Sequence, residues 1–476
     1  MIEFIFLLPM MTGIIALFLP VNLGRGVLVV TALLHLQVCV MGWMGKLEPI
    51  FGAFFGRSPE GMLVLLVTSF IFLFIAMYAV SYMAETSMQS EPIFIGCMLL
   101  FLGTMSMVAL ADHLIVLWIA IEATTLVSAP LIFINRSKRA LEATWKYVLI
   151  CSVGIALALL GCFFVTLSMD VAAINVPLTF TSLNAVAERL DPFWLSFGFI
   201  FIIIGYGTKM GLAPMHTWLP DAHSEAPSPA SALLSGALLN CAFLGVYKFH
   251  TLMHLAGLGS FSSNLLIGFG LVSMVVAGIF ILRQPDYKRM LAYSSIENMG
   301  IIAFGVGIGG IALYGALLHL IHHSLLKSSL FLSSGNILLG FGSKLVALVG
   351  GLTRFLPKTA VSFLAGFVGI SGLPPFGLFI SELCIIFGAF QAGHYLAAIV
   401  FIASLVLIVA GMAQIVTDMS FGGGDQVEIL VGEGFFRVMP PYVLLAASII
   451  LCVWLPDEIY QTIINTISVI GGTIHG

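Results

Sequence analysis

The sequence predicts an all-α integral membrane protein with about 14 transmembrane helices, and its composition and long apolar runs carry that prediction. Of the 476 residues, 60% are hydrophobic and only 8% are charged, whereas about a quarter of the residues in a soluble domain are charged. The mean hydropathy is +1.13. The apolar runs are about 20 residues long, which is the length that a helix needs to cross a bilayer. A soluble globule and a membrane barrel of short strands are therefore both excluded.

The individual spans follow from the apolar runs and the polar residues between them. Met1 to Pro20 lacks a basic leader segment, carries Glu3 and is followed at once by another apolar run. We therefore interpret it as the first helix and not as a signal peptide. The predicted spans are 2–20, 25–45, 61–83, 92–111, 114–134, 141–168, 193–216, 229–250, 263–283, 288–308, 311–340, 359–389 with an interruption, 395–417 and 438–455.

Basic residues are divided unequally between the two sets of predicted loops. One set holds only Lys46, Arg57 and Arg189. Because loops rich in Lys and Arg stay in the cytoplasm, the other set is predicted to be cytoplasmic and both termini to lie on the non-cytoplasmic side. That other set contains Arg25, Arg136, Lys138, Arg139, Arg283, Lys288, Arg289, Lys344, Arg354, Lys358 and Arg437.

Lys209 is the most informative residue, because it lies inside an apolar span in the stretch GTKMGLAPMHTWLPDAHSEAP. A cation at the centre of a bilayer costs at least a few kcal/mol, even with water and a partner nearby. Pro214 and Pro220 follow it and are expected to break the helix. Irregular backbone at this depth is tolerated only where it is buried in protein or lines a polar cavity. A buried charge beside a broken helix indicates an ion path.

A second interrupted span lies five spans later, in SGLPPFGLFISE, where Pro374 and Pro375 are expected to break the helix. Interrupted helices at corresponding places in two halves of a chain are typical of transporters built from inverted repeats. Glu382 ends this stretch and is the last carboxylate within a span, so it is a candidate exit site. The alternative is a residue at the membrane interface, since a boundary error of one turn would move it toward water.

Two further carboxylates fall within spans. Glu122 lies in LIVLWIAIEATTLVSAPLIF, and Lys209 is its natural partner, because pairing opposite charges offsets part of the desolvation cost of each. The pair could be switched by moving one member, or it could be a static structural ion pair. Glu297, in KRMLAYSSIENMG, is either a second group of the ion path or a partner for Lys288 or Arg289.

The eleventh span carries a cluster in HLIHHSLLKSSLF. His319, His323 and Lys327 are each four residues apart and so share one face of a helix. Histidine can accept and donate a proton near neutral pH, and Lys can do the same when burial destabilises its charged form. A proton wire is therefore predicted. A zinc site is the competing interpretation, but no acidic or thiol ligand accompanies the histidines. His322 points to another face and is interpreted as a packing or headgroup residue.

Polar residues near the ends of spans are weaker candidates. Asp221, His223 and Glu225 follow the first helix break and could form a cytoplasmic entrance, although a polar re-entrant loop would look the same. Lys146 and Lys248 lie at or near the ends of spans, from which long side chains can reach toward water.

The sequence contains no pattern for a redox centre or a nucleotide. The cysteines all fall in apolar spans and form no CxxC pair, so neither a metal site, an iron–sulfur cluster nor a disulfide framework is indicated. No glycine-rich dinucleotide fingerprint is present either. No cofactor is expected in this chain, and electrons must be handled by partner subunits. The cysteines are Cys39, Cys97, Cys151, Cys162, Cys241, Cys384 and Cys452.

Four stretches together resemble the antiporter-like proton-pumping subunits of respiratory complex I, multisubunit Na+/H+ antiporters and membrane-bound NiFe hydrogenases. They are GTKMGLAPMHTWLPDAHSEAPSPASALLSG, KRMLAYSSIENMGII, HLIHHSLLKSSLFLSSGNI and GLPPFGLFISE. The resemblance covers about residues 90–420 and is specific for this superfamily. Within it, SALLSGALLNCA and YSSIENMG look most like the F-type membrane component of hydrogenase-4 and formate hydrogenlyase-like complexes.

The resemblance implies 14 helices, two inverted five-helix repeats with broken helices 7 and 12, and a hydrated central axis. The implied segments are 1–90 (helices 1–3), 91–255 (helices 4–8), 256–418 (helices 9–13) and 419–476 (helix 14 and a short interfacial segment). It further implies proton-translocating roles for Glu122, Lys209, His319, His323, Lys327 and Glu382.

One departure from the family pattern affects the predicted path. Many relatives carry a lysine in the eighth span where this chain has Asn240, which cannot carry a proton as a charged group. The link between Lys209 and the eleventh span must then run through water, through Lys248 or through the histidines.

We therefore expect a proton-translocating subunit of a redox-driven complex in a bacterial or archaeal cytoplasmic membrane. Its partners would be other membrane subunits and a peripheral redox arm that holds iron–sulfur clusters and a NiFe centre or a quinone site. A subunit of a secondary Na+/H+ antiporter is the main alternative, and a membrane scaffold that no longer pumps is another.

Overall fold

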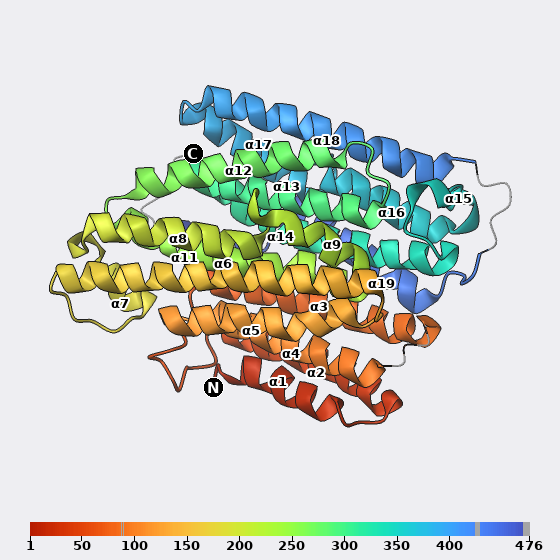
Figure 1. Cartoon of the computed structure of the whole chain (residues 1–476), viewed down its shortest axis with the longest axis horizontal. Coiled ribbons are helices and arrows are strands. Elements are labelled where there is room, and N and C mark those ends of the chain that lie inside the picture. Colours follow the sequence, from red (N-terminus) through yellow and green to blue (C-terminus); the bar gives the residue numbers. More distant parts are fainter. Residues whose placement is uncertain (87, 89, 424–428, 470–476) are drawn as a thin grey trace.

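The computed structural model describes residues 1–86, 88, 90–423 and 429–469, and the regular elements of this part of the chain are helical. The helices pack side by side in one bundle (Figure 1). They are α1 (Phe4–Ala16), α2 (Val21–Trp43), α3 (Pro59–Thr86), α4 (Glu91–Leu110), α5 (Leu114–Phe133), α6 (Lys138–Val171), α7 (Phe180–Ala185), α8 (Pro192–Met210), α9 (Trp218–Glu225), α10 (Ser228–Leu233), α11 (Leu239–Leu255), α12 (Gly259–Ile281), α13 (Tyr287–Ile308), α14 (Gly310–Phe341), α15 (Leu352–Phe355), α16 (Pro357–Ile370), α17 (Gly377–Gln391), α18 (Tyr395–Phe421), α19 (Phe435–Val453) and α20 (Asp457–Ser468).

The predicted fold class is confirmed, and each predicted span corresponds to a helix or to a pair of consecutive helices. Within the described residues, 11 helical stretches are long and apolar enough to cross a membrane, and α1, α16 and α17 are shorter apolar helices. The seventh span is α8 with α9, and the twelfth is α16 with α17. The 32-residue α14 is long enough to cross as well, but its His, Lys and Ser residues make it less apolar than the others.

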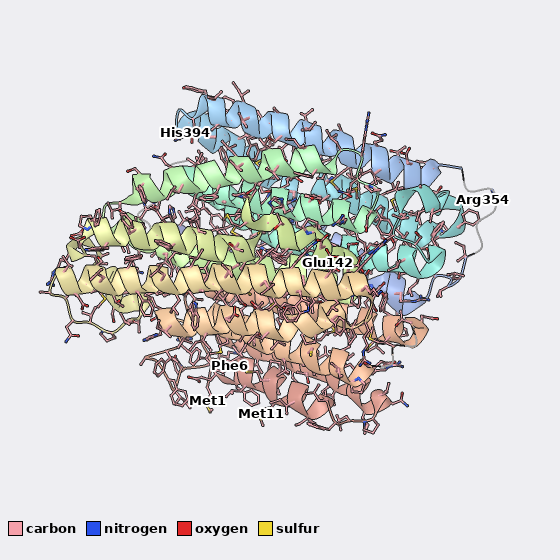
Figure 2. The ribbon with its side chains drawn as sticks, viewed as in Figure 1. Met1, Phe6, Met11, Glu142, Arg354 and His394 are labelled. Carbon is pink, nitrogen blue, oxygen red and sulfur yellow. The ribbon has the colours of Figure 1, made fainter. Side chains whose placement is uncertain are left out.

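The two ends of the bundle differ in charge. Arg354 lies at one end, and Met1 and His394 lie at the other (Figure 2). We call the end with Arg354 the basic end, because most residues of the larger basic set flank the helix ends there. Two members of that set are buried, since Lys288 is 0% exposed and Arg437 is 4% exposed.

The first helix break is built from a glycine and two side-chain hydrogen bonds. Gly211 adopts φ +86° at the end of α8, a conformation that favours glycine. Trp218 Nε1 donates to the Thr208 carbonyl at 2.9 Å, and Ser273 Oγ accepts from the Ala213 amide at 2.9 Å. These bonds satisfy backbone groups that the break leaves open, as burial requires.

The predicted helix breakers have different places in the structure. Pro214 lies in the break, but Pro220 does not, because it is the third residue of α9. A proline in the first turn of a helix removes no helical hydrogen bond, so Pro220 is compatible with a continuous α9. Pro374 and Pro375 lie between α16 and α17, as predicted.

The two broken helices run in opposite directions. In Figure 1, α8 leads to α9 from left to right, whereas α16 leads to α17 from right to left. Each broken helix is the fourth of five consecutive spans, counted from α4 and from α12. This arrangement is what an inverted duplication would produce, and the repeat boundaries at 91–255 and 256–418 stay a prediction.

The structure contains short elements that the sequence did not predict, and one short element that it did. The segment Leu234–Leu238 between α10 and α11 is π-helical, a form that is frequent at functional sites. The short helices α7 and α15 connect spans. The predicted C-terminal interfacial segment contains α20, in which Thr462 accepts a hydrogen bond from Trp43 Nε1 at 3.1 Å, and its place at the membrane interface stays a prediction.

Candidate ion path

Lys209 is held inside the first half of the bundle by neutral groups. Its side chain is 0% exposed. Its Nζ donates to Tyr147 OH at 2.6 Å and to Thr125 Oγ1 at 2.8 Å, and it lies 4.5 Å from the centroid of the Tyr147 ring. Tyr147 OH in turn lies 2.5 Å from Ser128 Oγ. The ammonium group thus has two hydroxyl acceptors and one aromatic face, which partly replace water around the charge.

Glu122 does not form the direct ion pair with Lys209 that the sequence suggested. Its carboxylate accepts from Ser152 Oγ at 2.7 Å and from Thr125 Oγ1 at 3.4 Å. Thr125 therefore stands between the two charges, accepting from Lys209 and donating to Glu122. Glu122 is also only partly buried, so it is not enclosed as Lys209 is. The two residues are coupled through one hydroxyl.

Asn240 links the first half of the bundle to α14. Its Nδ2 donates to Ser324 Oγ at 2.7 Å and to the Gly236 carbonyl at 3.1 Å. Its Oδ1 is buried and has no partner among the described residues. A buried amide oxygen without a protein partner is a place where a water molecule would be held. The structure thus gives Asn240 a contact with α14 and an open acceptor.

The central group on α14 is connected through α13 and not along its own helix. Lys327 Nζ donates to the Leu291 carbonyl at 2.8 Å and to Ser294 Oγ. Asn298 Nδ2 donates to the Ser294 carbonyl at 2.6 Å, and Asn298 Oδ1 faces His319 Nε2 at 2.9 Å. Two residues of α13 therefore join Lys327 to His319.

His319 also contacts the second broken helix. Its Nδ1 lies 3.0 Å from Ser381 Oγ, which itself donates to the Leu378 carbonyl at 2.8 Å. Both ring nitrogens face an oxygen, so the ring can carry a second proton without losing a contact. The next residue, Glu382, is 7% exposed and so is enclosed by protein, and its depth in the membrane stays a prediction. The series that starts at Lys327 ends at Ser381, the residue before Glu382.

Other predicted members of this group lie close by but form no hydrogen bond. His323 is fully buried, and neither of its ring nitrogens has a partner among the described residues. Glu297 is 3% exposed and forms no ion pair within the described part of the chain. The predicted pairing of Glu297 with Lys288 or Arg289 is therefore wrong. His322 packs elsewhere, with Nδ1 at 3.0 Å from Ser448 Oγ on α19, as expected of a packing residue.

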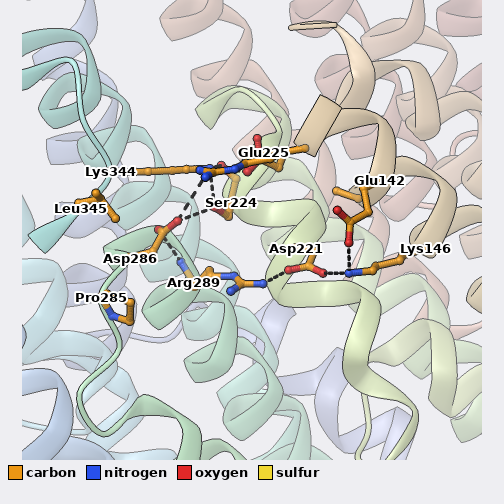
Figure 3. Close-up of a pocket in the computed structure, with 12 residues that line it drawn as sticks. Glu142, Lys146, Asp221, Ser224, Glu225, Pro285, Asp286, Arg289, Lys344 and Leu345 are labelled. Atoms are coloured by element: carbon orange, nitrogen blue, oxygen red, sulfur yellow. Dashed lines mark hydrogen bonds and ion pairs between the residues drawn. The ribbon is translucent and has the colours of Figure 1, made fainter. Parts of the chain in front are cut away.

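A charged cleft of about 320 Å³ opens beside α9, at the basic end. Figure 3 shows its side chains, which come from α6, α9, the start of α13 with the segment before it, and the segment after α14. Lys146 Nζ lies 2.6 Å from Glu142 and 3.0 Å from Asp221, and Asp221 also pairs with Arg289. The cleft residues are Arg139, Glu142, Ala143, Lys146, Asp221, Ser224, Glu225, Pro285, Asp286, Arg289, Lys344 and Leu345.

The residues of the predicted entrance separate on the two faces of α9. Asp221 and Glu225 line the cleft, and Glu225 pairs with Lys344 at 2.6 Å. His223 faces the interior, where it is 0% exposed and stacks on Phe331 of α14 with ring centroids 4.9 Å apart. The helix therefore separates a polar, open surface from a buried histidine.

Specific contacts with protein groups are also formed by three further lysines, namely Lys146, Lys288 and Lys248. Lys146 belongs to the charged cleft. Lys288 is buried, and its Nζ donates to the Ala226 carbonyl at 2.5 Å. Lys248 pairs with Glu60 on α3, with Nζ and Oε1 3.3 Å apart.

Several residues of the path were missed in the sequence, namely Thr125, Tyr147, Ser294 and Asn298. A usable signal was present, because Ser294 and Asn298 are four residues apart on one helix, as are His319 and His323. Groups of three or more potential metal ligands do not occur in the described residues. The prediction that the histidines hold no metal stays a prediction.

The fold and the buried ionisable groups define the class of protein: an antiporter-like membrane protein of the kind found in hydrogenase, complex I and Mrp-type complexes. Residues 111–407 match the family described as NADH:quinone oxidoreductase/Mrp antiporter, TM. The chain belongs to this family, because the match covers more than half of its length.

Three individual proteins illustrate the similarity. The chain is 36% identical over 396 residues to the hydrogenase-4 component F homolog of Methylacidiphilum infernorum (isolate V4), an alignment that covers 80% of this chain and 83% of that protein. The fold matches a chain of the membrane-bound sulfane sulfur reductase, an archaeal respiratory membrane complex, with a TM-score of 0.88, 22% identity and 99% and 98% coverage. A chain of the Mrp complex from Dietzia sp. DQ12-45-1b matches with a TM-score of 0.83, 19% identity and 98% and 97% coverage.

Proposed function

We propose that this chain translocates protons as one subunit of a redox-driven membrane complex related to membrane-bound hydrogenases and complex I. The observation that carries the proposal is the buried series Lys327, Ser294, Asn298, His319 and Ser381, which ends at the residue before the buried Glu382. Each contact in it involves a hydroxyl, an amide, an imidazole, an ammonium or a backbone carbonyl group. Lys327 and His319 can accept and release protons themselves, whereas the Asn298 amide and the Ser294 carbonyl cannot, so transfer past these two groups runs through intervening water.

The first half of the bundle supplies a charge that can bias this transfer. Lys209 and Glu122 share Thr125, so a change in the charge of either residue alters the electrostatic energy of the other. In a low-dielectric interior such an effect extends over several ångströms. Proton movement in one half can thus change the electrostatic energy of ionisable groups in the other half, through α10, α11 and Asn240.

Electron transfer is assigned to partner subunits. The sequence has no cysteine cluster and no dinucleotide fingerprint, which supports iron–sulfur clusters and a NiFe or quinone site elsewhere in the complex. Other membrane subunits and a peripheral redox arm are the proposed partners. The location is a bacterial or archaeal cytoplasmic membrane, with the basic end in the cytoplasm and both termini on the other side.

A subunit of a secondary Na+/H+ antiporter is the second candidate function, because the matching family includes Mrp antiporters as well as quinone oxidoreductases. The subunits that copurify with the chain separate the two candidates. Hydrogenase-like or quinone-reducing partners support the first, whereas a set of small membrane subunits alone supports the second.

The proposal is tested by reconstituting the complex with the variants Glu122→Gln and Lys209→Met. We expect redox activity with little or no pH gradient, or the loss of both if electron and proton transfer are tightly coupled. Lys46→Met is a matched control, because Lys46 is an exposed lysine at the end of the bundle opposite the basic end. Wild-type pumping in both test variants would contradict the proposal. If the complex still pumps after Glu122, Lys209 and Lys327 are neutralised together, this chain is a scaffold and the protons move through other subunits.

A further inference from the structure

A buried ion pair lies at the end of the bundle opposite the basic end. Lys248 of α11 and Glu60 of α3 have side chains that are 5% and 11% exposed, and their Nζ and Oε1 atoms are 3.3 Å apart. Lys248 Nζ also donates to Ser58 Oγ at 3.2 Å and lies 5.3 Å from the centroid of the Phe180 ring. The proton path described above does not include this pair.

A cavity with several polar side chains in its lining adjoins the pair. Its volume is about 110 Å³, which is room for several water molecules at about 30 Å³ each. Asp112 and Thr181 line it together with Lys248 and Glu60, and so does Asn184, whose Oδ1 is buried without a partner among the described residues. Figure 1 places α7, which contains Thr181 and Asn184, at the end of the bundle away from α9 and α15. The ion pair is therefore next to a site for water at this end.

The position of Lys248 on α11 gives the pair a connection to the interior. Lys248 follows Asn240 by eight residues, which is about 12 Å along a helix. Asn240 faces α14 through Ser324 and cannot itself release a proton. Lys248 is the nearest lysine further along α11, and α11 ends at this face of the bundle.

The C-terminal helix α20 covers the same region. Tyr247, the neighbour of Lys248, donates from its hydroxyl group to the Thr466 carbonyl at 2.9 Å, and Val469 lines the cavity. The pair is thus enclosed by α3, α7, α11 and the end of α20, and the cavity is its contact with water at this end.

We infer that Lys248 and Glu60 form a proton-exchange port for the first half of the bundle. The inference rests on the proposed function and deepens it. The Lys248 ammonium passes a proton to the Glu60 carboxylate, 3.3 Å away, and the Glu60 carboxyl group releases it to water in the cavity. The neutral Lys248 amine then regains a proton from the interior. No bond other than N–H and O–H is formed or broken. A purely structural pair that fastens α3 to α11 is the competing explanation.

The variant Lys248→Arg separates the two explanations. Arginine keeps a positive charge for the ion pair but does not deprotonate in proteins. If the pair is a port, reconstituted Lys248→Arg should keep its thermal stability and its redox activity but lose proton translocation by about tenfold or more, which is the scale of a lost acid–base group. If the pair only stabilises the packing of α3 against α11, this variant should pump as the wild type does.

The controls keep this test independent of folding and of the proposed function. Arg57 and Glu48 form an exposed pair, 2.9 Å apart, so Arg57→Gln should leave stability and pumping unchanged. If Lys248→Arg unfolds early, Glu60→Gln provides the second measurement, with the same loss expected. Full pumping in a stable Lys248→Arg variant overturns the port, even if Lys209→Met is inactive. Full pumping in both Lys209→Met and Glu122→Gln overturns the proposed function, whatever Lys248→Arg does.

Discussion

At the scale of single residues, the distinctive feature is that Lys209 has hydroxyl groups around it instead of a carboxylate. A buried charge that loses one partner of an ion pair is typically destabilised by about 3–5 kcal/mol. Hydrogen bonds to a charged group contribute only about 1.5–3 kcal/mol each. The two bonds to Thr125 and Tyr147 together contribute about 3–6 kcal/mol, so they stabilise the charge of Lys209 about as well as a direct contact with Glu122 would.

We expect Thr125→Val to impair translocation, because it removes the one hydroxyl group that contacts both Lys209 and Glu122. The loss of a hydrogen bond to the ammonium group, about 1.5–3 kcal/mol, corresponds to a rate lower by roughly tenfold or more. The initial rate of proton uptake by proteoliposomes measures this effect.

The neighbouring residue provides a matched control for that variant. Thr124 is buried on the same helix, but its hydroxyl group donates to the Ile121 carbonyl at 2.6 Å and to neither charge. Thr124→Val should therefore pump nearly as fast as the wild type. Equal losses in the two variants would mean that packing in α5, and not the shared hydroxyl group, limits transfer.

At the scale of helices, the sequence predicted the spans and both interruptions, because hydropathy, proline and glycine act locally. The partners of Lys209 and Lys327 could not be predicted in this way. Tyr147 and Ser294 reach these lysines from helices that are far away in the sequence or that face them only after packing. The misplaced break at Pro220 has a local reason, since a proline can equally begin a helix.

In the region of α10 and α11, the candidate path contains the Asn240 amide and water in place of an ionisable side chain. We expect Asn240→Ser to keep most proton translocation, because a small polar side chain leaves room for water. Asn240→Leu should exclude water from this region and so stop proton translocation. The unpartnered Oδ1 of Asn240 is the physical reason for expecting water there. The measurement is the internal pH of proteoliposomes loaded with a pH-sensitive dye.

The same substitutions test the alternative that Asn240 only fastens α11 to α14. Its hydrogen bond to Ser324 would then contribute about 1 kcal/mol to packing, and both variants would lose a little stability and still pump. Equal pumping by the Ser and Leu variants would place the route elsewhere, most directly through Lys248.

At the scale of the whole molecule, the charged cleft joins elements from the two halves of the chain. Asp221 on α9 pairs with Arg289 on α13, and Glu225 pairs with Lys344 after α14. Single ion pairs that are partly exposed contribute little to stability. Their importance here is geometric, since they hold the second segment of the first broken helix against the second half of the bundle, near buried Lys288 and His223.

The orientation of the whole bundle decides on which side of the membrane this cleft opens. Even without Lys288 and Arg437, which are buried, the basic residues at the basic end outnumber Lys46, Arg57 and Arg189 at the other. The positive-inside bias therefore still predicts that the basic end is cytoplasmic.

We test the orientation with the variants Arg354→Cys and His394→Cys, since both positions are exposed and lie at opposite ends of the bundle (Figure 2). A membrane-impermeant maleimide should label Arg354→Cys only in inverted vesicles and His394→Cys only in right-side-out vesicles. The unsubstituted protein is the control, because its seven cysteines are all buried or partly buried. The reverse labelling pattern would place the charged cleft outside the cytoplasm. The Lys248 cavity would then face the cytoplasm, and the two openings would exchange roles as sites of proton entry and release.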